Sequence, residues 1–119
     1  MALLDNLRAA GGHSPWGAIV FAKSSGKWGM AWGHASRKEA VVSAVSSCGD
    51  ARQCTMELSF FGTECGAFAY SGTTWALTAR ANADKAKEAA LADCQKGGRS
   101  CRIVATVCAS GSDRRQADK

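Results

Sequence analysis

Apolar and polar positions alternate along two stretches near the start of the chain, and this pattern predicts a β-hairpin. Segment 17–22 is rich in β-branched and aromatic side chains, which favours a strand. After the polar turn 24–27, segment 28–35 places large side chains on one face and glycine or alanine on the other. Two such segments joined by a short polar turn are typical of a hairpin.

The spacing then changes to that of an amphipathic helix. Ser36 can cap the first turn, Glu39 stands three residues later as in a capping box, and Gly49 can end the helix. Its apolar stripe consists of Ala40, Val41, Ala44, Val45 and Cys48. Segment 55–61 returns to alternation and predicts a strand whose large side chains on one face are Met56, Leu58 and Phe60.

The second half of the chain repeats this order of elements. Segments 66–70 and 74–80 predict two strands, and Asn82 can cap a helix that reaches Cys94. Segment 101–108 predicts a closing strand. Each half is therefore expected to be one strand-strand-helix-strand unit.

Matching residues indicate that the two halves are pseudo-repeats, 16–61 and 65–108. Trp16-Gly17-Ala18 corresponds to Cys65-Gly66-Ala67, and the helices match at two alanines and a cysteine. The connection Gly62-Thr63-Glu64 is too short for an interdomain linker, so both copies should share one core.

These patterns predict one α+β domain over residues 16–109. The duplicated units are expected to form one mainly antiparallel sheet packed against two helices. Residues 1–15 are expected to be an N-terminal arm and residues 110–119 a flexible tail.

The duplication also pairs four of the six cysteines. Cys48 closes the first helix and Cys54 opens the following strand, while Cys94 and Cys101 hold the same two places in the second copy. A disulfide within each copy would connect the end of a helix to the next strand. Three disulfides are then expected in total, each contributing on the order of 2–4 kcal/mol of stability.

The remaining cysteines, Cys65 and Cys108, align with two aromatic residues of the first copy, Trp16 and Phe61. Alternation places both thiols on the sheet face opposite to the bulky side chains, which are Phe68, Tyr70, Ile103, Ala105 and Val107. A Cys65–Cys108 disulfide and a Trp16–Phe61 contact would therefore occupy the same cross-strand position.

Free buried cysteines or a zinc site are the alternatives to disulfides. Zinc sites usually contain closer cysteine pairs, and the histidines of this chain are His13 and His34. Disulfides are favoured, and they predict a secreted or periplasmic protein. Residues 1–10 contain Asp5 and do not resemble a secretory signal, so we expect a removed signal or another export route.

Several short motifs follow one another along the chain. They are Trp16-Gly17-Ala18-Ile19-Val20, Gly26-Lys27-Trp28-Gly29, Cys48-Gly49 with Cys54 nearby, Cys65-Gly66-Ala67, and the closing run 101–108. Together they resemble a bacterial family known as domain of unknown function 4189, over about residues 16–108. The resemblance implies a small exported α+β protein with disulfides, as in secreted mycobacterial members, and it transfers no catalytic residues.

Composition and charge narrow the classes of partner. The net charge is +5, but the basic residues are spread along the chain, so nucleic-acid binding is not expected. No stretch approaches the roughly 20 apolar residues of a membrane span, and none is predicted.

The polar residues do not combine into a known catalytic arrangement. His34 has no partner implied by its neighbours, and we expect it to be a surface or capping residue. The serines of the first helix lack a nucleophile-elbow pattern, and Gly97-Gly98 is not followed by Lys-Ser or Lys-Thr as in a phosphate loop. We predict a non-enzymatic protein with no cofactor and no metal.

Trp28, Trp32 and Trp75 form the candidate binding patch. If a helix covers their face they belong to the core, which is the favoured interpretation because large side chains usually fill interiors. If they are exposed, they could bind a protein or a glycan.

The predicted function is a small exported protein-binding module, such as a secreted effector or an inhibitor or immunity-type protein. Its partner would be another protein, and the chain itself would be a monomer or a small homo-oligomer. The alternatives are a hydrolase with an unrecognised site and a basic surface binder of nucleic acid or an anionic envelope polymer.

Overall fold

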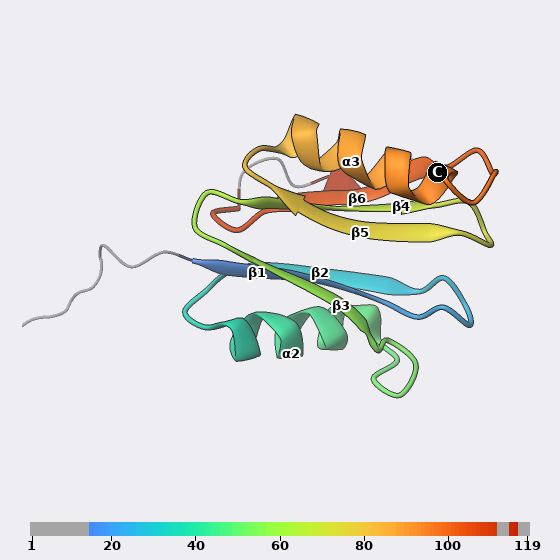
Figure 1. Cartoon of the computed structure of the whole chain (residues 1–119). Helices are drawn as coiled ribbons and strands as arrows, with labels where there is room; N and C mark the ends of the chain where they lie inside the picture. The colour runs from blue at the N-terminus through green and yellow to red at the C-terminus, as the bar shows by residue number, and fades with distance from the viewer. Residues whose placement is uncertain (1–14, 112–114, 117–119) are drawn as a thin grey trace, which may run out of the picture.

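The computed structural model describes residues 15–111 and 115–116. It contains two antiparallel sheets that lie face to face, and each sheet is covered on its outer side by one helix (Figure 1). The resulting layers are helix, sheet, sheet and helix, with one repeat supplying each helix and the sheet beneath it.

The first repeat forms a three-stranded sheet and one helix. The elements are β1 (Trp16–Phe21), β2 (Trp28–His34), α2 (Arg37–Cys48) and β3 (Met56–Phe61). β1 is the central strand and pairs with β2 on one side and β3 on the other.

The second repeat has the same topology. Its elements are β4 (Cys65–Tyr70), β5 (Trp75–Arg80), α3 (Ala83–Gln95) and β6 (Arg102–Cys108). β4 is central between β5 and β6. A short strand, β7 (Arg115–Gln116), extends this sheet beside β6.

The two terminal segments fall largely outside these elements. The predicted arm, residues 1–15, lies outside the described residues apart from Pro15. The predicted tail, residues 110–119, contains β7, whose two residues pair with Ala105 and Thr106 of β6.

Both helices begin at the predicted caps. The Ser36 hydroxyl accepts a hydrogen bond from the Glu39 amide at 3.1 Å, and the Asn82 side chain accepts one from the Lys85 amide at 2.9 Å. Gly49 ends α2 in the left-handed conformation, with φ of 80°.

The α+β class and the repeated unit are confirmed, but the single shared sheet is corrected to two sheets. The physical reason is that the central strands are apolar on both faces. In β1, Ala18 and Val20 face α2, whereas Ile19 and Phe21 face the opposite sheet. One helix covers only one of these faces, so the second face is buried by the sheet of the other repeat.

The core between the sheets is built from large side chains of both repeats. Its buried members are Ile19, Phe21, Met30, Phe60, Phe68, Val104, Ala105, Val107 and Ala109. The rings of Phe21 and Phe68, one from each repeat, lie with centroids 4.5 Å apart. The ring of Phe60 fills a space left by Gly17 and Gly66, because a Cβ at either glycine would collide with it.

Each helix packs on the face of its sheet that points away from the core between the sheets, and this face carries small residues. α2 approaches β2 so closely that a Cβ at Gly29 would collide with the helix backbone at Ala44 and Cys48. In the second repeat, the Thr78 hydroxyl of β5 donates to the Ala86 carbonyl of α3 at 2.8 Å. Small side chains therefore set the distance between each helix and its sheet.

A bulge in the β4–β6 ladder changes one predicted orientation. The register shifts between Phe68 and Ala69, which leaves one residue of β6 unpaired with β4. As a result, Ala105 and Val107 face the core between the sheets, whereas Ile103 packs on the α3 side. The prediction that Ile103 shares a face with the other two is wrong.

Candidate functional site

The three tryptophans of the candidate binding patch pack against the core between the two sheets. Trp28, Trp32 and Trp75 are each partly buried there, and the ring of Trp75 lies 5.5 Å from that of Phe21. They face the opposite sheet rather than a helix. The structure therefore places them with the core and not in an exposed patch.

The most exposed large apolar side chain in the described part of the chain is Val42 of α2, at 60%. Two shallow hollows of about 490 and 270 Å³ flank it. We call their combined lining the α2 surface, and it consists of His34, Arg37, Lys38, Glu39, Val41, Val42, Ser43, Ser46 and Glu57.

The α2 surface combines an apolar centre with a charged and polar rim. Arg37 of α2 forms an ion pair with Glu57 of β3 at 3.3 Å, which ties the helix to the edge strand. Lys38 borders both hollows, and its ammonium group makes no ion pair or hydrogen bond with any described residue. Val41, beside Val42, is partly buried against the core under the helix.

The second repeat shows what the fold requires at the position of Val42. The helices align at Ala40 with Ala86 and at Ala44 with Ala90, so the equivalent of Val42 is Glu88. Glu88 is exposed on α3. An apolar side chain at this position is therefore a feature of the first repeat and not a demand of the fold.

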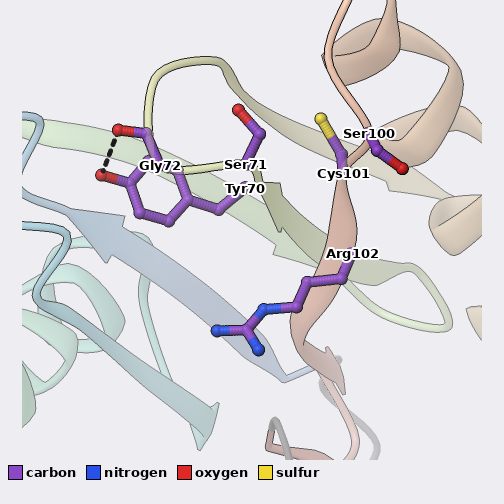
Figure 2. Close-up of a pocket in the computed structure, with 6 residues that line it drawn as sticks. All are labelled: Tyr70, Ser71, Gly72, Ser100, Cys101 and Arg102. Carbon is purple, nitrogen blue, oxygen red and sulfur yellow. Dashed lines mark hydrogen bonds between the residues drawn. The ribbon is translucent and has the colours of Figure 1, made fainter.

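A separate pocket lies at one end of the sheet of the second repeat, where β4 ends and β6 begins (Figure 2). Its volume is about 320 Å³. We call it the Tyr70–Arg102 pocket, and its lining consists of Tyr70, Ser71, Gly72, Ser100, Cys101 and Arg102. The two residues that name it lie opposite each other in the β4–β6 register.

Of the candidate catalytic residues, His34, Ser43 and Ser46 line the larger hollow beside Val42. The larger hollow beside Val42 brings His34, Glu39 and Ser43 to one surface, yet no hydrogen bond joins His34 to either neighbour. Among the described residues, no group of three or more His, Cys, Asp or Glu could hold a metal ion.

Three disulfides brace this scaffold. They join the pairs that the duplication predicts, namely Cys48–Cys54, Cys65–Cys108 and Cys94–Cys101. Every cysteine of the chain is thereby bonded. Three disulfides in a domain of this size indicate folding in an oxidising, extracytoplasmic compartment.

The cross-strand position of the third disulfide is filled differently in the first repeat. Trp16 lies opposite Phe61 in the β1–β3 register, as Cys65 lies opposite Cys108 between β4 and β6. The two aromatic rings are in contact, with centroids 4.7 Å apart. The structure thus shows the correspondence expected from the repeat.

Comparison with family models identifies the family of this chain. The model described as "Domain of unknown function (DUF4189)" matches residues 16–108, which are both repeats from β1 to the end of β6. The chain belongs to the DUF4189 family. No curated protein matches this DUF4189 chain.

A solved structure shares the fold of this DUF4189 domain. The NMR structure of Rv1813c from Mycobacterium tuberculosis matches with a TM-score of 0.58 and 28% sequence identity. The match covers 91% of this chain and 97% of that chain. Within the described residues, no helix has the length and apolar character needed to cross a membrane.

The sequence patterns do not mark either surface of this DUF4189 domain as a site. Val42 belongs to a helix rich in valine, and Arg102 is one of many scattered basic residues. Position-by-position comparison of the two repeats is the signal that finds both, because each surface lies where one copy departs from the other.

Proposed function

We propose that this DUF4189 protein is a small secreted or periplasmic binding module that recognises another protein through the α2 surface. The observation that carries the proposal is the exposed Val42, which stands where the second repeat has Glu88. Its expected partner offers an apolar side chain to the hollows beside Val42 and polar groups to the rim. A central apolar contact inside a polar rim is the usual anatomy of a protein interface.

The rigidity of the α2 surface supports recognition. The Cys48–Cys54 disulfide holds the end of α2, and the Arg37–Glu57 ion pair lies near its start. The close approach at Gly29 fixes the height of the helix above its sheet. A surface held in place before binding loses little conformational entropy when a partner docks.

Replacing Val42 with glutamate is expected to abolish partner binding without unfolding the protein. The variant introduces the residue found in the second repeat, and glutamate is a better helix former than valine by a few tenths of a kcal/mol. We therefore expect its melting temperature to stay within about 2 °C of the parent protein. Circular dichroism melting checks this half of the prediction.

Site-specific photo-crosslinking checks the other half. A photoreactive residue at Ser46, within the α2 surface, should capture a protein from the extracytoplasmic fraction of the source organism. The same probe at Ala92, the equivalent exposed position of α3, serves as the matched control and should give no such adduct. Adding Val42→Glu to the Ser46 probe should remove the adduct.

Two outcomes would count against the proposal. An adduct that persists at equal yield in the Val42→Glu protein would show that the valine is not the contact. An adduct consisting of two copies of this chain would make the α2 surface a homo-oligomer interface instead of a site for a separate partner.

A further inference from the structure

The Tyr70–Arg102 pocket lies at a place where the two repeats differ in chemistry. In the first repeat, Phe21 of β1 stands opposite Met56 of β3. In the second repeat, Tyr70 of β4 stands opposite Arg102 of β6 at the same point of the ladder. A phenol and a guanidinium thus replace a phenyl ring and a thioether on the same framework. The fold does not require either polar group.

The charge of Arg102 is uncompensated in this pocket. Its side chain is exposed and forms no hydrogen bond or ion pair with any residue in the described part of the chain. None of the described residues that line the pocket carries a carboxylate. A guanidinium is a planar fork of donors that fits phosphate and carboxylate oxygens, so an anionic group is the ligand chemistry that matches it.

The rest of the lining is held in position by the scaffold. The ring of Tyr70 packs 5.2 Å from that of Phe21, and its phenol donates to the Gly72 carbonyl at 3.3 Å (Figure 2). The Ser71 hydroxyl accepts from the Thr74 amide at 2.9 Å. The Cys94–Cys101 disulfide anchors the chain just before Arg102.

The size and mixture of groups define the rest of the ligand. A volume of about 320 Å³ lies at the lower end of the range for small-molecule pockets, which is about 300–1,000 Å³. It admits a single sugar ring more readily than a chain of them. A serine hydroxyl, a phenol and one cation together suit a hydroxylated ring that carries an acid group.

We propose that the Tyr70–Arg102 pocket binds a monosaccharide-sized ligand bearing one phosphate or carboxylate group. Arg102 holds the acid group, and the Ser100 hydroxyl and the phenol oxygen of Tyr70 contact the hydroxyl groups of the ring, because the Ser71 hydroxyl is already bonded within its turn. The pocket belongs to the second repeat and is separate from the α2 surface of the first. The two sites can therefore be tested independently.

The test is an NMR titration of the full chain, labelled with nitrogen-15, with glucose 6-phosphate, glucuronate, inorganic phosphate and neutral glucose. Both acidic sugars should shift the amides of residues 70–72 and 100–102 more strongly than glucose does. Stronger binding of one acidic sugar than the other identifies the preferred acid group. Replacing Arg102 with methionine, the first-repeat residue, should weaken binding at least ten-fold.

Arg52→Met is the matched control, because it removes the same charge from an exposed position of the first repeat. It should leave the affinity unchanged. The proposal is overturned if no probe shifts these amides or if glucose binds as well as its phosphate. Equal weakening by the two arginine variants would also overturn it, since binding would then follow net charge alone. Inorganic phosphate binding as tightly as glucose 6-phosphate would contradict the contribution of the sugar ring.

Discussion

Replacing Cys65 and Cys108 together with alanine is expected to lower the free energy of unfolding by roughly 4 kcal/mol. The bond closes the longest loop of the three, with a sequence separation of 43 against 6 and 7 for the others. A longer loop has more conformational freedom in the unfolded chain, so its closure removes more entropy. The bond also links the first and last strands of the second repeat across their ladder.

Denaturant and thermal unfolding in non-reducing buffer measure this effect. The melting temperature should fall by roughly 15 °C for the double alanine variant. The matched comparison is Cys48→Ala with Cys54→Ala, for which the same loop argument gives a loss of only about 2 to 3 kcal/mol. An equal or larger loss in the second variant would contradict the loop-length argument.

Truncating Phe60 to alanine is expected to cost about 3–5 kcal/mol, which is the usual range for a buried phenylalanine. Phe60 is 1% exposed and comes from the first repeat, but its ring lies against glycines of both central strands. Gly17 and Gly66 have no side chains that could move into the vacated space. The cavity should therefore stay largely open, and the loss should lie near the upper end of the range.

Phe61→Ala provides the control for this prediction. The neighbouring side chain is 44% exposed at the outer face of β3, where it contacts Trp16. Its truncation should cost about 1 kcal/mol, because little buried volume is lost. Chemical denaturation of the two variants measures the loss in the free energy of unfolding for each. A loss for Phe60 no larger than that for Phe61 would show that the interface between the sheets contributes little to stability.

The elements and the disulfide pairing could be predicted because both depend on local patterns and on the repeat. Ser36 and Asn82 are polar residues at the start of periodic apolar segments, and both cap helices in the structure. Two disulfides follow from equal cysteine positions in the two copies, and the third joins the remaining pair, Cys65 and Cys108, at the position that aligns with Trp16 and Phe61. These inferences needed no knowledge of how the copies sit against each other.

The prediction of one shared sheet is wrong because the central strands are apolar on both faces. β1 carries small apolar residues such as Ala18 on one face and large ones such as Phe21 on the other. A strand that is apolar on both faces is buried on both. In β2, the helix packs on the face that carries small residues such as Gly29. The face that carries Trp28 and Trp32 is therefore left to pack against the other sheet.

The orientation of Ile103 could not be predicted from alternation. Strict alternation assumes an unbroken ladder, whereas the shift between Phe68 and Ala69 inserts one residue into β6. A bulge of this kind reverses the face of every residue on one side of it. Nothing in the residue types of the closing strand marks the position at which the shift occurs.

The candidate sites could not be predicted from residue types alone. Val42 lies in a helix whose other valines, Val41 and Val45, pack against the core, so its exposure depends on the exact helix face. The pocket forms only because the ladder places Arg102 opposite Tyr70. The repeat carries the missing information, since each site coincides with a difference between equivalent positions.

Differential scanning calorimetry of the intact, oxidised protein tests most directly whether the two repeats share one interior. The core between the sheets takes large side chains from both copies, so neither sheet can lose its partner and remain buried. We predict a single transition whose calorimetric and van't Hoff enthalpies are equal. Two resolved transitions, or a van't Hoff enthalpy well below the calorimetric value, would contradict a single cooperative unit formed by both repeats.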